Sequence, residues 1–425
     1  MTKTRKTWRP RGHIIERKGA KGTAFRLKLD LPSTGGNRRT AYKTVKGSRK
    51  DAERELRKMI DQAEKGVRID AANQTLTEWI EVWLRDHIRH DVTTRTHERY
   101  CDVLRQYVEP RIGKLPLREL GPLDIERLYH ALGENGGRPR GPKPKTKRDA
   151  PPKGLAPRTV ILTHRVLFGC LKDAARLRVI DHNPVADVKR PRVTKTAATA
   201  GDGGRSPAKM QILDTDDLSR LLDGFRTRRL ETASYPLVLL ALDSGARRGE
   251  LLGLRWSDVD LDKRTLKIQR SVETTRAHGV TLKPELKTES SRRTITLSAQ
   301  TASVLRGLWK EQTETLLKIG HRLPPDALIF PVSILEPTTP RRPSGVTKGF
   351  VRVANDLGFT GLRFHDLRHN CASHMLEAGR SIPDVAHHLG HSNPAITMSV
   401  YAHAIPRKES GSGLLDMMMP ALTPA

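Results

Sequence analysis

The sequence predicts a multidomain α+β protein. It should have a small β-rich N-terminal domain, a helical domain, and a mixed, mainly helical domain that carries a small antiparallel sheet. Three observations predict this class. The chain has 425 residues, more than one hydrophobic core usually organises. Strand-like segments bounded by turn residues occur near the N-terminus and again after residue 260. Between them, apolar residues recur with helical spacing.

The first predicted domain covers residues 1–70. Three short strands are expected between residues 11 and 45, separated by the turn sequences GAKG and PSTGGN, and a helix should run from Ser48 to Gly66. These 70 residues hold 21 lysines and arginines against 8 aspartates and glutamates, a net charge of +13. A sheet that lies in a DNA groove and a basic module that contacts only phosphates both fit this composition.

The second predicted domain, residues 75–190, is helical. The segment TLTEWIEVWLRDHI places four apolar residues on one helical face: Leu76, Ile80, Trp83 and Leu84. The pattern repeats in THERYCDVLRQYVEPRIG, which Pro110 and Gly113 should end.

Two further helices are expected at 122–132 and 157–180. The segment between them, 136–156, is rich in proline, glycine, lysine and arginine. This composition favours a disordered basic loop, with contact to a DNA groove as the alternative.

Residues 191–210 lack periodicity and are rich in small residues, which favours a linker. A third domain should cover 211–410, with its first helix capped by Asp214 or Thr215. Its expected strands are RTLKIQRSV, GVTLKPEL and RRTITL. The tail, 411–425, carries the apolar patch LLDMMMPAL.

The net charge of +30 and the pI of about 10.5 indicate a polyanionic partner. Nucleic acid is the usual one, and an anionic membrane surface is the other. No apolar run approaches the ~20 residues that span a bilayer. The basic N-terminus has no apolar segment typical of a secretory signal. We therefore expect double-stranded DNA as the partner and no membrane association.

The cysteines indicate a reducing compartment. Cys101, Cys170 and Cys371 are an odd, widely spaced set with no C-x-x-C pair. Reduced, packed thiols in a cytoplasmic protein are expected, without a zinc knuckle.

The segment SGARRGE contains Arg247 and Glu250, one helical turn apart. A glutamate can hold a guanidinium while leaving donors free for a phosphate. Taken alone, the segment fits an ordinary surface Arg–Glu pair better.

The segment HDLRH places His365 and Arg368 on one helical face, a combination that suits an anionic transition state. A metal site at His365 and His369 is the alternative, because the two are four residues apart. That alternative is disfavoured because an arginine lies between the ligands and no glutamate base is present.

Three more residues complete the candidate site. Lys287 falls between two expected strands, where a hairpin tip could deliver it into a groove, and Lys283 competes for the same role. His391 follows Gly390 at a helix end, and Tyr401 lies in a short helix just beyond it. Together with the arginines, these side chains could attack a phosphodiester without a metal ion or other cofactor.

The order of these residues resembles that of the tyrosine recombinase (phage integrase) family. The family's Arg, Lys, His-x-x-Arg, His and Tyr match six residues here: Arg247, Lys287, His365, Arg368, His391 and Tyr401. The segments LLGLRWSDVD, HDLRH and LGHS also resemble sequence motifs of this family. The resemblance covers 211–410, while 75–190 resembles the family's core-binding domain and 11–66 its arm-binding domain. Ser244-Gly245-Ala246 departs from the commoner Thr-Gly-Leu or Thr-Gly-Met.

The resemblance implies a site-specific recombinase, the integrase of a phage or integrative element. Tyr401 would form a 3′-phosphotyrosine, the two arginines would neutralise the phosphorus centre, and Lys287 would protonate the leaving 5′-oxygen. His365 would assist proton transfer from the tyrosine, His391 would hydrogen-bond a nonbridging oxygen, and Glu250 would position its neighbours.

The family also implies a homotetramer on two DNA attachment sites, with a DNA-bending host factor and a directionality factor as further partners. A type IB topoisomerase-like enzyme and a non-catalytic DNA-binding regulator are the alternatives. The arm-binding resemblance argues against the first, and the complete residue set argues against the second.

Overall fold

The computed structural model describes residues 11–19, 22–34, 37–64, 74–136, 154–192, 210–228, 234–284 and 291–402. The chain divides into two compact units, residues 1–207 and 208–425, and each is described by itself. Most of the expected loop 136–156, most of the expected linker 191–210 and all of the tail 411–425 lie outside the described residues, as does Lys287.

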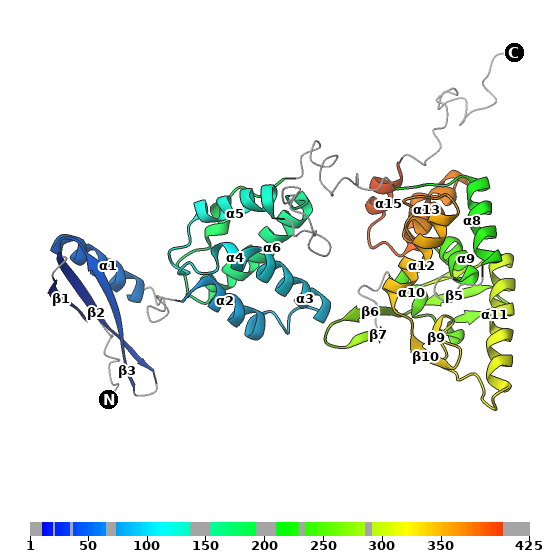
Figure 1. Ribbon diagram of the computed structural model, residues 1–425, viewed down its shortest axis with the longest axis horizontal. Coiled ribbons are helices and arrows are strands. Elements are labelled where there is room, and N and C mark those ends of the chain that lie inside the picture. Colours follow the sequence, from blue (N-terminus) through cyan, green and yellow to red (C-terminus); the bar gives the residue numbers. More distant parts are fainter. Residues whose placement is uncertain are drawn as a thin grey trace, which may run out of the picture. The chain divides into compact units, whose positions relative to one another are not determined.

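The first unit begins with an antiparallel sheet covered on one face by a helix (Figure 1). The strands are β1 (Arg11–Gly19), β2 (Gly22–Thr34) and β3 (Asn37–Lys46), and the helix is α1 (Arg49–Glu64). Alternate residues of β2 point to the helix, as expected for a strand with one buried face. These β2 residues are Phe25, Leu27 and Leu29, and they pack with Ala41 of β3 and with Ala52, Met59 and Ala63 of α1.

The rest of the described part of this unit is helical and has its own apolar core. Its α-helices are α2 (Leu76–Val82), α3 (Thr94–Val103), α4 (Glu109–Ile112), α5 (Pro122–Asn135) and α6 (Pro157–Arg176). Two tryptophans connect the first helical segment to α6. Trp79 Nε1 donates to the Cys170 carbonyl at 3.1 Å, and Trp83 Nε1 donates to Asp173 Oδ2 at 2.8 Å.

Pro110 does not end its helix, contrary to the expectation from sequence. The preceding residues, Leu104–Val108, form a π-helical turn in which the Glu109 amide donates to the carbonyl of Leu104, five residues back. A proline at the start of the next helix, α4, lacks only an amide that the helix start does not use. The helical path therefore continues to Ile112, and Gly113 caps it.

The second unit consists mainly of helices around small antiparallel sheets (Figure 1). Its α-helices are α8 (Thr215–Thr227), α9 (Tyr235–Ser244), α10 (Arg248–Leu252), α11 (Ala299–Leu317), α12 (Pro343–Asp356), α13 (Asp366–Glu377), α14 (Ile382–Leu389) and α15 (Pro394–Tyr401). Asp214 caps α8, because its side chain accepts the Asp217 amide at 2.8 Å. The elements of both units agree with the predicted α+β class.

The strands of this unit pair differently from the sequence expectation. A three-stranded sheet has the order β4 (Val259–Asp260), β5 (Thr265–Ile268), β8 (Arg293–Thr296). A separate hairpin joins β6 (Ser271–Thr275) to β7 (Gly279–Lys283), and another joins β9 (Pro331–Ser333) to β10 (Glu336–Pro340). The expected strand RTLKIQRSV is thus two strands in two sheets. The strands β7 and β8 pair with β6 and β5 and not with each other, and Lys287, which falls between them in the sequence, lies outside the described residues.

Three phenylalanines form the centre of the apolar core of the second unit. Phe350 of α12 stacks on Phe225 of α8 with ring centroids 5.4 Å apart, and it meets Phe364 edge to face at 5.4 Å. Phe350 is fully buried. No helix in the described parts of the chain is long and apolar enough to cross a membrane.

Truncating this central ring should destabilise the second unit strongly. Phe350→Ala should lower the free energy of unfolding by about 3–5 kcal/mol, because it removes two ring contacts and leaves a cavity. Urea denaturation followed by far-ultraviolet circular dichroism measures the change. Trp309→Ala, at a half-exposed site on α11, is the control and should change it by less than about 1 kcal/mol. Equal effects of the two substitutions would contradict the central role of Phe350.

Candidate active site

Two glycines in the left-handed conformation shape the site. Gly245 ends α9 with φ of 56°, and Gly390 ends α14 with φ of 69°. A side chain at either position would also collide: a Cβ at Gly245 would lie 2.6 Å from Leu389, and one at Gly390 would lie 2.8 Å from Arg293. Glycine is therefore required at both turns.

Each of these turns holds one arginine of the candidate site. The Gly245 carbonyl accepts a hydrogen bond from Nη1 of Arg368 at 2.6 Å, and the Gly390 carbonyl accepts one from Nη2 of Arg247 at 3.2 Å. Both bonds join residues more than 120 positions apart in the chain. The two helix ends therefore fix the positions of both guanidinium groups.

Glu250 holds Arg247 at two points. Arg247 is the N-cap of α10, one residue before the helix, and its amide donates to Glu250 Oε2 at 2.9 Å. Its Nη1 donates to Oε1 at 2.8 Å. Glu250 is 3% exposed, whereas the Arg247 side chain is 41% exposed, so this is not the surface pair that the segment alone would suggest.

A third arginine, Arg293, completes the arrangement, although the sequence patterns did not single it out. Its fully buried guanidinium donates from Nη2 to Glu250 Oε2 at 3.0 Å, from Nε to the His388 carbonyl at 2.7 Å, and from Nη1 to the Ser291 carbonyl at 3.0 Å. The sequence pattern that could have identified Arg293 is the alternation of buried and exposed residues in β8, where Arg293 shares the buried face with Ile295. An arginine on the buried side of a strand indicates a specific partner.

The charges in this cluster affect one another. Burial by itself would raise the pKa of Glu250, but the charges of Arg293 and Arg247 and the hydrogen bonds from Arg247 outweigh it, and the pKa is lowered. Burial lowers the pKa of Arg293, and its ion pair with Glu250 opposes this. The carboxylate is therefore ionised and stabilises both guanidinium groups.

Arg368 of α13 is buried with one donor group unused. It is 3% exposed, and its Nη2 has no hydrogen-bond partner within the described ranges. Burial, and then the nearby charge of Arg247, lower its pKa to about 10, so it stays cationic at neutral pH. A buried guanidinium with an open donor is suited to bind an anion.

The two predicted histidines, His365 and His391, are neutral at pH 7. Desolvation, and then neighbouring positive groups, lower the pKa of each to about 4. His365 caps the start of α13, where one side of it is exposed. His391 follows the Gly390 turn, and its Nδ1 lies 2.8 Å from Thr397 Oγ1. Each ring can exchange hydrogen bonds without adding charge to the site.

Tyr401 lies at the end of α15, with its side chain 1% exposed. Its hydroxyl is 2.7 Å from Nδ1 of His369, a residue that the sequence suggested only as a metal ligand. Burial raises the pKa of Tyr401 to about 12, although the charge of Arg368 acts in the opposite direction. The structure thus brings Tyr401 within electrostatic reach of Arg368.

Lys283, the competing lysine, is engaged elsewhere. It ends β7, and its Nζ lies 2.8 Å from Glu273 Oε2 on the paired strand β6. This ion pair occupies the ammonium group that would have to carry a proton to a substrate. Lys287 itself lies in the segment 285–290, outside the described residues.

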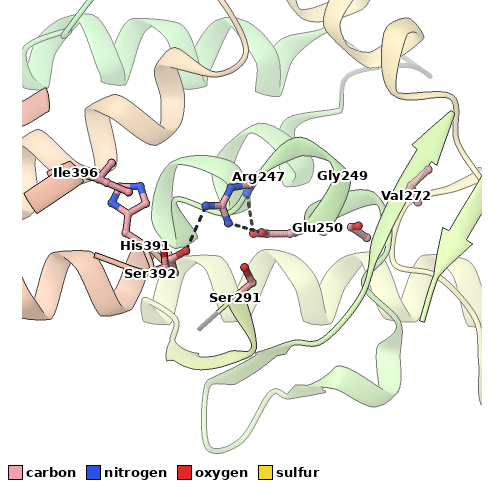
Figure 2. A pocket seen from close by; sticks show the side chains of 10 residues that line it. Arg247, Gly249, Glu250, Val272, Ser291, His391, Ser392 and Ile396 are labelled. Atoms are coloured by element: carbon pink, nitrogen blue, oxygen red, sulfur yellow. Dashed lines mark hydrogen bonds and ion pairs between the residues drawn. The ribbon is translucent and has the colours of Figure 1, made fainter. Parts of the chain in front are cut away.

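A cavity of about 400 Å³ opens beside these groups (Figure 2). Arg247, Glu250 and His391 line it together with Ser291, Gly390 and Ile396. The cavity is many times the ~30 Å³ that one water molecule occupies in the liquid. The guanidinium of Arg247 and the ring of His391 lie in this lining, and a cationic group beside a hydrogen-bonding ring suits a phosphodiester. Within the described residues, no three histidine, cysteine, aspartate or glutamate side chains are grouped so that they could hold a metal ion.

Comparison with known proteins identifies the family. Residues 211–407 match the phage integrase family, and residues 75–133 match the phage integrase N-terminal SAM-like domain. The chain belongs to the phage integrase family. The resemblance noted in the sequence is thereby confirmed, and the chain is a tyrosine-type site-specific recombinase.

Curated relatives align with most of this recombinase. A XerC-like tyrosine recombinase of Caldanaerobacter subterraneus subsp. tengcongensis is 24% identical over 374 residues, which are 86% of this chain and 88% of the relative. An integrase of Streptomyces ambofaciens is 23% identical over 377 residues, 86% of each chain.

Solved structures share its fold. The Tn1549 transposon integrase in complex with transposon right end DNA has a TM-score of 0.56 at 17% identity and covers 82% of this chain and 99% of its own. A lambda integrase dimer bound to a COC′ core site has a TM-score of 0.51 at 15% identity and covers 94% of this chain and 97% of its own.

Replacing Arg293 by lysine should disturb the site while keeping its charge. An ammonium group cannot reproduce the planar fork, so at least two hydrogen bonds are lost at about 1 kcal/mol each. Arg293→Lys should slow single-turnover DNA cleavage by roughly tenfold or more and lower the unfolding free energy by ~1–3 kcal/mol. The control is Arg292→Lys at the exposed neighbouring position, which should change neither quantity. Wild-type cleavage by Arg293→Lys would show that its hydrogen bonds do not position the site.

Proposed function

We propose that this recombinase cuts and rejoins DNA through a 3′-phosphotyrosine at Tyr401, and that it integrates and excises a mobile element by this chemistry. The observation that carries the proposal is the open, buried Nη2 donor of Arg368, whose charge partly opposes the rise that burial causes in the pKa of Tyr401. An anion bound there would lie beside the tyrosine hydroxyl. A phosphodiester provides such an anion and is the group that a tyrosine can attack.

The proposed reaction has two symmetric steps. The Tyr401 oxygen forms a bond to phosphorus, and the bond from phosphorus to the 5′-oxygen breaks. In the second step a 5′-hydroxyl of a partner strand attacks the phosphotyrosine and releases Tyr401. Because the covalent intermediate keeps a phosphoester bond, rejoining needs no separate energy source.

The arginines would stabilise the charge that develops on phosphorus. Arg247 and Arg368 are each held by a glycine carbonyl, so their remaining donors are fixed before substrate binds. His391, which lines the cavity together with Arg247, would donate a hydrogen bond to a nonbridging oxygen. His365, on the exposed start of α13, would add another contact of this kind. Glu250 would position Arg247, and Lys287 would protonate the leaving 5′-oxygen.

The N-terminal sheet supports a second DNA contact. Its helix-free face carries the residues that alternate with the buried ones: His13, Arg26, Lys28, Tyr42, Thr44 and Lys46. The guanidinium of Arg26 lies 4.4 Å from the centre of the Tyr42 ring. A basic sheet face with an aromatic residue suits both groove contact and phosphate contact. We assign this face to DNA arms outside the cleavage site.

We assign a separate role to each domain predicted from the sequence. Residues 1–70 would bind arm-type DNA, 75–190 the core site, and 211–410 would perform the chemistry, with 191–210 as the linker and 411–425 as the tail. The enzyme would act in the bacterial cytoplasm or nucleoid as four copies on two attachment sites. A DNA-bending host factor and a directionality factor would assist it.

Removing the nucleophile tests the central proposal. Tyr401→Phe keeps the ring and its packing, so it should bind the core site with unchanged affinity and form no covalent adduct. A nicked suicide substrate, analysed on a denaturing gel, measures the adduct. Tyr235→Phe is the matched control and should form adduct like the wild type. An adduct that persists in Tyr401→Phe would assign the nucleophile to another residue.

Deleting residues 1–66 should separate recognition from chemistry. The segment carries a large share of the positive charge and none of the proposed catalytic residues. The shortened protein should cleave a core-site suicide substrate, yet fail to integrate between full attachment sites. Its binding to full sites should also depend less on salt, with a slope that is smaller by about 0.9 for each phosphate that the protein no longer neutralises.

Salt titration of both proteins on one full-site DNA measures that slope, and a strand-exchange assay measures integration. An unchanged slope together with unchanged integration would refute the arm-binding assignment. Relaxation of supercoiled DNA without any exchange between paired sites would instead favour a topoisomerase-like enzyme.

A further inference from the structure

The hydroxyl of Tyr401 contacts a histidine outside the set of six that the family resemblance supplies. His369 Nδ1 lies 2.7 Å from the Tyr401 oxygen, and the two ring centroids are 5.6 Å apart. The phenol is almost completely buried, so bulk solvent cannot reach its proton directly. When the oxygen attacks, its proton needs an acceptor that is already in contact with it.

We propose that His369 is the general base that takes the proton from Tyr401. The inference rests on the proposed function of Tyr401 as the nucleophile. As the oxygen–phosphorus bond forms, the phenolic proton moves to Nδ1 of His369. The bond from phosphorus to the 5′-oxygen breaks, and the leaving oxygen takes a proton from a separate acid, for which Lys287 is the candidate. In the rejoining step His369 returns its proton to Tyr401.

The surroundings of His369 suit this role. Burial lowers its pKa, so the ring is neutral at pH 7 and a lone pair can face the phenol. The charged and titratable groups around it are Tyr401 from α15, Asp366 and Arg368 from α13, Arg363 and His365 just before that helix, and His391 after α14. Asp366 favours the protonated ring, whereas the two arginines oppose it. A bound phosphate would offset the arginine charge and make proton transfer easier.

Tyr401 needs such a base because it does not ionise by itself. With a pKa of about 12, roughly one molecule in 10⁵ carries a phenolate at pH 7. A positioned base commonly accelerates a reaction by ~10²–10⁴-fold.

His365 is placed less favourably for this proton. It precedes α13, one turn before His369, and the two rings meet edge to face with centroids 4.9 Å apart. The hydrogen bond of the phenol goes to His369. His365 therefore lies next to the base, on the side that is open to substrate.

The test separates proton removal from proton donation. A suicide substrate with sulfur in place of the bridging 5′-oxygen has a leaving group that departs without a proton. Lys287→Ala should cleave the oxygen substrate slowly and recover on the sulfur substrate. His369→Gln should be slowed about 10²-fold on both substrates, because the attacking oxygen still needs a base. His387→Gln, exposed on α14, is the matched control and should behave like the wild type.

The pH dependence of single-turnover cleavage gives a second readout that a packing defect would not change. The wild-type rate should fall as the pH drops through the pKa of His369 and level off above it. In His369→Gln the rate should keep rising towards the pKa of the phenol, and added imidazole should restore part of the activity of His369→Gly.

The outcomes distinguish this inference from the proposed function. If Tyr401→Phe still forms an adduct, the proposed function fails. If Tyr401→Phe is inactive but His369→Gln cleaves within twofold of the wild type, the role of His369 is refuted. It is also refuted if His369→Gln keeps the wild-type pH profile, or if the altered profile belongs to His365→Gln instead.

Discussion

The geometry of the active site depends on one buried carboxylate, that of Glu250. It accepts hydrogen bonds from the backbone and side chain of Arg247 and from the side chain of Arg293. A buried charge is costly unless it is paired and fully hydrogen-bonded, so each of these bonds is needed for the others to be stable. Through Arg293 the same carboxylate is connected to the end of α14. It thereby holds α10, β8 and the turn before His391 in one arrangement.

This arrangement leaves an excess of positive charge. Glu250 pairs with Arg247 and Arg293 but not with Arg368, and the charges of these two arginines add to the effect of burial in lowering the pKa of Arg368. In the proposed reaction a phosphodiester would relieve the repulsion among these arginines when it binds. More negative charge would collect on the phosphorus centre as the tyrosine attacks, so the relief would be larger in the transition state. The fixed charges would therefore favour catalysis as well as binding.

The histidines contribute in a different way. His365 and His391 have pKa values of about 4, and burial also lowers the pKa of His369. Arginines thus supply permanent charge, while in the proposed reaction neutral imidazoles would exchange hydrogen bonds and accept a proton. This separation keeps the net charge of the site constant over the neutral pH range, where a histidine of ordinary pKa would titrate.

The sequence by itself determined the family and the features set by local chemistry. The family was identified by the order of six residues, because these residue types rarely occur in this order by chance: Arg247, Lys287, His365, Arg368, His391 and Tyr401. Local rules also located the Asp214 cap, because capping depends only on neighbouring residues.

Tertiary structure decided what depends on contacts distant in the chain. β8 pairs with β5 and not with β7, although β7 is the strand that precedes it in the sequence. Arg293 points into the protein interior, where its charge is paired with Glu250, 43 residues away in the sequence. His365 and His369 lie four residues, or about one helical turn, apart. Only the packing of α15 determines which of them contacts the phenol of Tyr401. Short-range patterns cannot encode these choices, because the free energy that selects them comes from burial and hydrogen bonds between distant segments.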